Sequence, residues 1–175
     1  MRFASYVTTT GNATWGAESE GQLHDLGLTG LGIAPTLHDA IATRAVETVA
    51  SLAGAPVQPV ESTRFLPVVS APSKVICIGV NYRTHQEETG RADMVAPTVF
   101  MRFADTLAAH GDELPIPAES DKYDYEGEVA LIIGSPAYRV SKERAGEVIA
   151  GYAAFNDLSA RDWQRHTGQW TPGKN

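Results

Sequence analysis

The sequence is poor in cysteine and has no long hydrophobic run, and each absence excludes a class of protein. The 175 residues include one cysteine, Cys77, so a disulfide framework within a single chain is impossible. Cys77 lies in an apolar run, where we expect it to pack as a small hydrophobic side chain. The N-terminal MRFASYVTTTG lacks the apolar segment of a signal peptide, and no stretch approaches the ~18 apolar residues that span a membrane. These features predict a cytoplasmic protein.

Positive charge is also in the minority. The chain has 14 Lys and Arg against 21 Asp and Glu, a formal net charge of −7, so it carries no electrostatic footprint for nucleic acid or an anionic membrane. A small anionic substrate would need a local positive site, such as a metal ion. The hydrophobic content of 43% and the charged content of 20% are those of an ordinary soluble globular protein.

The first 70 residues predict a small N-terminal domain. Residues 2–7 alternate loosely as a strand, and the turn-rich TTTGNATW that follows predicts a hairpin. A glycine-marked loop comes next, with Gly27, Gly30 and Gly32. The proline-bearing run of residues 56–72 is typical of a connector to a different module.

One helix is predicted within this domain. Thr36 begins the pattern T-L-H-D, a capping box in which Asp39 can reach back to the Thr36 amide. Apolar residues then recur at helical spacing, at Ile41, Ala45 and Val49. Gly54 and Pro56 end the element.

Strands dominate the prediction for the rest of the chain. KVICIGV, residues 74–80, is a nearly continuous apolar strand of the type that is buried on both faces. Residues 97–103 and 152–155 predict further strands. Ser141 predicts the start of a second helix that Gly151 closes, with Ala145, Val148 and Ile149 on its inner face.

Residues 83–89 predict a short polar helix that carries His85 and Glu88. Residues three apart on a helix are neighbours, so Glu88 can hold and polarise the His85 imidazole in a general-base dyad. The same spacing is common on solvent-facing helices, and a plain surface pair is the alternative interpretation.

DYEGEVALIIG, residues 124–134, combines an apolar strand with two carboxylates at its start. Alternate residues on a strand share a face, so Glu126 and Glu128 would point into the same space. Like charges repel there unless a proton or a cation neutralises them. With no Cys or His nearby, the cation would be Mg²⁺ or Ca²⁺ rather than zinc. Asp157, at the end of a strand, is placed to be a third ligand, whereas a solvated strand end is the alternative.

Four segments in order resemble the fumarylacetoacetate hydrolase family. KVICIGVNYRTHQEE is similar to the family's opening strand and its His-bearing lid, and PTVFMRFADTLAAHGDELPIP is similar to the segment that follows. DYEGEVALIIG resembles its E-x-E metal strand, and YAAFNDLSARDWQ with TPGKN resembles its Asn-Asp and Gly-Lys signatures. The resemblance covers residues 72–175.

The resemblance implies an α+β fold, in which a small N-terminal domain (residues 1–70) precedes a catalytic domain built as a mixed β-sandwich roll (residues 71–175). It also implies that the chain is truncated, because the family domain continues beyond Asn175 through further strands. A sheet that ends there would keep unpaired edges and exposed apolar faces. Where many members have Lys-Pro, this chain has Arg102 and Phe103, so no substrate contact is assigned there.

The resemblance further implies a set of site residues. Mg²⁺, with Ca²⁺ or Mn²⁺ as possibilities, would bind Glu126, Glu128 and Asp157. His85 and Glu88 match the lid dyad that activates water. Gln164 and Lys174 match the family's remaining catalytic positions.

The implied activity is metal-dependent hydrolysis of a carbon–carbon bond in a small acylpyruvate or fumarylpyruvate-type 2,4-diketo acid, typical of aromatic catabolism. Relatives use the same constellation for isomerisation or decarboxylation of 2-keto or 2-hydroxymuconate-type acids, since these reactions share an enolate. A homodimer is the implied assembly. The second alternative is an inactive fragment that binds only metal or a partner protein.

Overall fold

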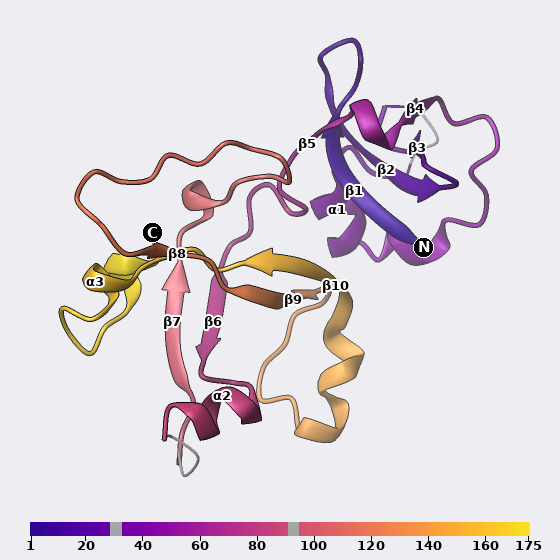
Figure 1. Ribbon diagram of the computed structural model, residues 1–175. Coiled ribbons are helices and arrows are strands. Elements are labelled where there is room, and N and C mark those ends of the chain that lie inside the picture. Colours follow the sequence, from indigo (N-terminus) through magenta and orange to yellow (C-terminus); the bar gives the residue numbers. More distant parts are fainter. Residues whose placement is uncertain (29–32, 91–94) are drawn as a thin grey trace. The chain divides into compact units, whose positions relative to one another are not determined.

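The computed structural model describes residues 1–28, 33–90 and 95–175 (Figure 1). The chain forms two compact units. The first comprises Met1–Ala71, Leu107–Leu114 and Gly127–Phe155, and the second comprises Pro72–Thr106, Pro115–Glu126 and Asn156–Asn175. The predicted domain boundary between residues 70 and 71 stays a prediction. Gly30 and Gly32 of the predicted loop lie outside the described residues.

A five-stranded antiparallel sheet, in the order β4-β3-β2-β1-β5, forms the N-terminal part of the first unit. The predicted hairpin is confirmed, because β1 (Arg2–Val7) pairs with β2 (Ala13–Ser19). Its turn contains Gly11 at φ +86°, a left-handed conformation that glycine adopts without steric cost. The other strands and the single-turn helix after β4 are β3 (Gln22–Asp25), β4 (Val57–Pro59), η2 (Val60–Ser62) and β5 (Arg64–Phe65).

The predicted capping box starts α1 (Leu37–Ala42), with one difference in its bonds. The Thr36 hydroxyl accepts from the Asp39 amide at 3.1 Å and donates to Asp39 Oδ2 at 2.7 Å, where we expected the Thr36 amide to donate. The helix is shorter than predicted. Arg44 lies in the left-handed region at φ 60°, which interrupts the helical hydrogen bonds, and the chain continues as the 3₁₀ helix η1 (Ala45–Thr48).

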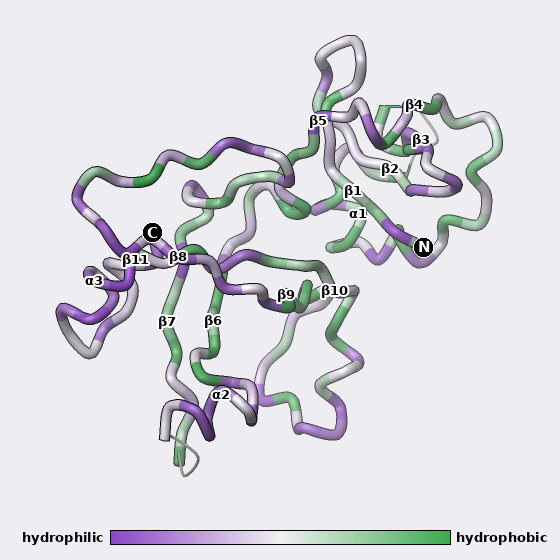
Figure 2. Tube along the Cα trace, viewed as in Figure 1, coloured by the Kyte–Doolittle hydropathy of each residue, from purple (hydrophilic) through white to green (hydrophobic). Residues whose placement is uncertain are grey.

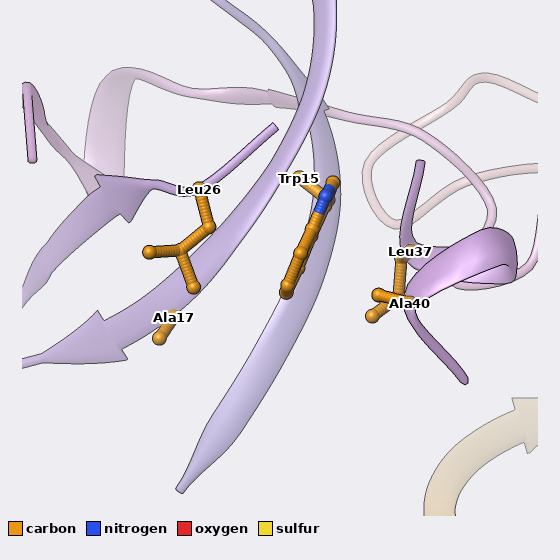
Figure 3. Close-up of a cluster of buried hydrophobic side chains, with 5 residues drawn as sticks. All are labelled: Trp15, Ala17, Leu26, Leu37 and Ala40. Atoms are coloured by element: carbon orange, nitrogen blue, oxygen red, sulfur yellow. The ribbon is translucent and has the colours of Figure 1, made fainter. Parts of the chain in front are cut away.

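The core of this region lies between the sheet and α1 (Figure 3). Its fully buried hydrophobic cluster consists of Trp15, Ala17, Leu26, Leu37 and Ala40. The Trp15 indole, completely buried, donates its N–H to Ala34 O at 2.9 Å, so its one polar atom is satisfied. Burial of this large ring accounts for the position of the helix against the hairpin.

A two-stranded ladder of β9 (Gly127–Ile133) and β10 (Ile149–Asn156) follows later in the chain. The predicted α-helix from Ser141 to Gly151 is wrong. Residues Lys142–Val148 form the 3₁₀ helix η4, and β10 begins at Ile149. The physical reason is sheet pairing: Val148 O accepts from Gly134 N at 2.8 Å, so the chain joins the strand ladder where the helix was expected to continue.

The second unit contains an antiparallel pair, β6 (Val75–Gly79) and β7 (Thr98–Arg102), whose register places Val75 opposite Arg102. Figure 2 shows hydrophobic residues along both strands. The prediction that β6 is buried on both faces is wrong, since Ile76 is 57% and Ile78 is 42% exposed. Alternate side chains of a strand point to opposite faces of the sheet. Only the face that carries Phe100 is covered by described residues of this unit, and there the ring centres of Phe100 and Trp170 lie 5.6 Å apart.

Short elements complete the second unit. They are α2 (Arg83–Glu88), η3 (Ala104–Thr106), β8 (Tyr123–Asp124), β11 (Ser159–Ala160), α3 (Arg161–Gln164) and η5 (Thr171–Gly173), with β8 antiparallel to β11. The mixture of strands with short helices agrees with the predicted α+β class. Among the described residues, no helix combines the length and the apolar character that a membrane span requires.

Candidate active site

Three of the predicted site residues meet at one ammonium group in the second unit. Lys174 Nζ donates to Glu126 Oε2 at 2.9 Å and to Asp157 Oδ2 at 2.7 Å. Lys174 is only 2% exposed, and Asp157 only 4%. Charged side chains are rarely buried so deeply unless they are paired, and here the three charges satisfy one another.

The backbone brings the two carboxylates together where β9 begins and β10 ends. Asp157 N donates to Glu126 O at 2.9 Å, and Glu126 N donates to Asn156 Oδ1 at 3.2 Å. The Asn-Asp pair therefore has two distinct roles. Asn156 fixes the backbone of Glu126, and Asp157 contributes its carboxylate.

Gly173 allows Lys174 to lie at this position. A Cβ on Gly173 would be 2.3 Å from the Gln164 backbone nitrogen and 2.6 Å from Ala160 O, closer than real side chains approach. Only glycine permits η5 to lie so near α3. The Lys174 ammonium also lies 5.1 Å from the centre of the Phe100 ring, a cation–π distance.

Arg161, the first residue of α3, connects the cluster to Asp124 on β8 and to Gln164, the last residue of α3. Its guanidinium donates from Nη1 to Glu126 Oε1, and from Nε and Nη2 to Asp124 Oδ2 at 3.0 and 2.8 Å. The same Nη1 donates to Gln164 Oε1 at 3.2 Å, which places the predicted residue Gln164 beside the cluster, almost fully buried. Sequence reasoning gave Arg161 no role. The available signal was its spacing, three residues before Gln164 on one helical turn.

Arg102 is the second residue that sequence reasoning left without a role. Its Nε donates to Asp157 Oδ1 at 2.5 Å, and its Nη2 donates to Leu158 O. The side chain is 7% exposed. No local pattern could have identified this contact, because 55 residues separate Arg102 from Asp157.

The electrostatics of the cluster are balanced. Arg102, Arg161 and Lys174 face three carboxylates, those of Asp124, Glu126 and Asp157. Burial raises the pKa of the Glu126 carboxyl, but Lys174 and then Arg161 outweigh this effect, and the pKa lies below its ordinary value. Burial lowers the pKa of Arg161, whereas its hydrogen bonds to Asp124 and Glu126 raise it by more.

The remaining predicted site residues are Glu128, His85 and Glu88. Glu128 is half-buried on β9, in the first unit, on the same strand face as Ala130 and Ile132. His85 and Glu88 lie on α2 with 3.7 Å between His85 Nδ1 and Glu88 Oε2, a distance for an ion pair but too long for a hydrogen bond. Both side chains are mostly exposed. The structure does not test the dyad, which stays a prediction.

The donor chemistry of the cluster fits a hard divalent cation. Glu126 and Asp157 offer only oxygen atoms, and Mg²⁺ is commonly bound through one or two carboxylates with water or substrate completing its shell. Within the described part of the chain, no group of three or more His, Cys, Asp or Glu side chains is clustered closely enough to hold a metal by itself. Glu128, the predicted third carboxylate, belongs to the first unit, and its role as a ligand stays a prediction.

Comparison with known proteins identifies the family to which the chain belongs. The family model for the fumarylacetoacetate (FAA) hydrolase C-terminal domain matches residues 74–175. The chain belongs to the fumarylacetoacetate hydrolase family. The match includes every predicted site residue and both arginines, and the family's known members include isomerases, tautomerases and hydrolases.

Two curated relatives illustrate the sequence similarity. The chain is 43% identical over 105 residues to a Dictyostelium discoideum homolog of fumarylacetoacetate hydrolase domain-containing protein 2, a match of 59% of this chain and 34% of the relative. It is 36% identical over 135 residues to a mitochondrial oxaloacetate tautomerase of Homo sapiens, a match of 76% of this chain and 43% of the relative. The chain thus matches less than half the length of these relatives.

Solved structures of the family share the fold. A fumarylacetoacetate hydrolase from Exiguobacterium antarcticum superimposes with a TM-score of 0.77 at 28% identity, over 99% of this chain and 61% of that one. A 5-carboxymethyl-2-hydroxymuconate delta-isomerase from Mycobacterium smegmatis gives 0.71 at 29% identity, over 100% and 62%. These similarities confirm the predicted α+β fold of the family.

Proposed function

We propose that this protein is a metal-dependent enzyme that interconverts the keto and enol forms of a small 2-keto acid with a second carboxylate, an oxaloacetate-like substrate. The observation that carries the proposal is the buried Lys174 ammonium held between Glu126 and Asp157. Support also comes from the human relative, an oxaloacetate tautomerase, and from the structurally similar delta-isomerase.

The proposed metal is Mg²⁺, held by Glu126, Asp157 and the predicted third ligand Glu128. When bound, it would supply a Lewis acid that withdraws electron density from the 2-keto oxygen of the substrate. Ca²⁺ and Mn²⁺ are the alternatives that oxygen ligands allow.

Lys174 is the proposed proton carrier. Two of its three N–H groups already donate to Glu126 and Asp157, which leaves the third for a substrate oxygen. In the keto-to-enol direction Lys174 would give a proton to the 2-keto oxygen and, as the neutral amine, accept the proton that leaves the adjacent carbon. Proton and charge then balance within one residue. Arg161, which contacts Glu126, and Gln164, which contacts Arg161, are the proposed contacts for the substrate's carboxylates.

Thermal unfolding tests the metal site directly. The melting temperature would be compared in EDTA, in Mg²⁺, and in Mg²⁺ with oxalate, which mimics a 2-keto acid. A ligand at a hundredfold excess over its Kd stabilises the fold by about 2.7 kcal/mol. We expect a rise with Mg²⁺ that oxalate enlarges, that Asp157→Asn abolishes, and that the exposed control Asp121→Asn retains. A wild-type chain that melts identically in all three solutions would contradict the proposal.

Activity is tested by the decay of enol oxaloacetate in the ultraviolet. We expect Lys174→Met to lose the catalysed rate while Lys142→Met, at an exposed lysine, keeps it. Catalysis that survives Lys174→Met would exclude Lys174 as the proton carrier.

Hydrolysis of an acylpyruvate-type carbon–carbon bond is the second candidate. It would rely on the predicted dyad of His85 and Glu88, because hydrolysis needs an activated water and tautomerisation does not. The structurally similar protein from Exiguobacterium antarcticum is a fumarylacetoacetate hydrolase. Decarboxylation of a 2-keto acid is a related alternative on the same residues.

The dyad discriminates between the two candidates. If the enzyme is a hydrolase, His85→Ala abolishes acylpyruvate cleavage, and the exposed control His38→Ala leaves it intact. If it is a tautomerase, both variants keep the oxaloacetate rate of the wild type.

A further inference from the structure

Arg102, the last residue of β7, donates hydrogen bonds to two different acceptors. Its Nε donates to Asp157 Oδ1 at 2.5 Å, and its Nη2 donates to the carbonyl oxygen of the next residue, Leu158. Both side chains of the ion pair are nearly inaccessible, with 7% of Arg102 and 6% of Asp157 exposed.

The two contacts together restrict the orientation of the Asp157 carboxylate. The bond to Leu158 O ties the rigid guanidinium plane to the backbone beside Asp157, so the bond from Nε fixes Oδ1 relative to that same backbone. Oδ2 then faces Lys174, which holds it at 2.7 Å. Arg102 itself is anchored through the β6–β7 ladder, where it lies opposite Val75.

The geometry points to Arg102 as a positioning residue that fixes Asp157 in the orientation in which it binds the divalent cation. This inference rests on the proposed metal-dependent function and goes beyond it, since neither the sequence nor the resemblance assigned Arg102 a role. Partners that orient metal ligands typically contribute 10- to 100-fold to metal affinity.

The positive charge of Arg102 and its orienting effect on Asp157 would change metal affinity in opposite directions, which makes the inference testable. A cation beside a metal site repels the metal, so if Arg102 acted only through its charge, its removal would strengthen metal binding. If Arg102 acts by orienting Asp157, its removal weakens metal binding. The sign of the change therefore distinguishes the two roles.

The experiment measures Mn²⁺ binding to the full chain from the electron paramagnetic resonance signal of the free ion, with Arg102→Met, Arg102→Lys and a control, Arg144→Met. Arg144 is a surface arginine paired with Glu147, its side chain 72% exposed. We expect Arg102→Met to weaken Mn²⁺ binding by about 10- to 100-fold. Lysine can donate to Oδ1 but cannot also hold Leu158 O, so Arg102→Lys should restore part of the affinity. The control should match the wild type.

A second readout separates positioning from general damage to the fold. For the positioning role, the kcat of Arg102→Met recovers toward the wild-type value as the metal concentration rises, whereas damage to the fold leaves kcat low at every concentration. Mn²⁺ binding by Arg102→Met that equals or exceeds that of the wild type would overturn the inference. Should that variant fail to fold, wild-type affinity in Arg102→Lys would overturn it equally. A wild-type chain that binds no Mn²⁺ would refute the proposed function itself and this inference with it.

Discussion

Replacing Gly173 by alanine tests whether the position of Lys174 depends on the close approach of η5 to α3. The added Cβ would lie 2.3 Å from Gln164 N, 2.6 Å from Ala160 O and 2.6 Å from Gln164 Cα. All three atoms belong to the backbone, so no side chain can rotate away to relieve the overlap. To reach ordinary van der Waals separation, η5 must move by roughly 1 Å or more.

The expected cost follows from these contacts. Forcing an extra carbon into a packed site costs about 1–3 kcal/mol, and the lower chain entropy of unfolded alanine returns about 0.4–1 kcal/mol. We therefore expect Gly173→Ala to lose about 1–2 kcal/mol of unfolding free energy. Lys174 is the next residue, so the same shift would lengthen its hydrogen bonds of 2.7 and 2.9 Å and weaken the cluster.

Hydrogen–deuterium exchange measures the effect where it arises. Amides of residues 156–175 should exchange faster in Gly173→Ala, and urea unfolding should give a lower midpoint. The matched control is Gly168→Ala, because a Cβ on Gly168 meets no atom within 4 Å. Equal protection of this segment in both variants, with equal midpoints, would refute the packing argument.

Two further predictions concern acid stability and helix capping. Burial raises the pKa of Glu126, but Lys174 and Arg161 together hold this pKa below its ordinary value of 4.5. The ionised Glu126 carboxylate therefore stabilises the fold above pH 4.5. This stabilisation is lost as the pH falls through the lower pKa of the folded state. Lys174→Met should therefore move acid unfolding, followed by circular dichroism, to higher pH, and acid unfolding at the same pH as the wild type would contradict this cause. Thr36→Ala should cost about 1 kcal/mol by removing the cap of α1, whereas Thr36→Ser should keep most of it. Equal urea midpoints for these two variants would refute the capping role.

Local features of the fold were predictable from the sequence. Turn residues after Val7 predicted the first hairpin, and Thr36 with Asp39 predicted the start of α1, because the interactions that form these features lie within a few residues. The family resemblance selected Glu126, Asp157, Gln164 and Lys174. In the second unit the Lys174 ammonium contacts Glu126 and Asp157, and the Arg161 guanidinium contacts Gln164. The metal-binding role of Glu128 and the catalytic role of the His85 dyad stay predictions.

The side chains that can do chemistry, and the turns and helix starts that nearby hydrogen bonds close, can be read from the amino-acid sequence. Which of those side chains touch depends on the fold. Residues 142–148 have a helical pattern, but pairing of Gly134 with Val148 gives a strand from Ile149, since a ladder bond to a distant residue outweighs local propensity. The roles of Arg102 and Arg161 have the same origin. Each guanidinium meets a carboxylate more than 30 residues away in sequence, so the contact forms only when folding brings the two residues together.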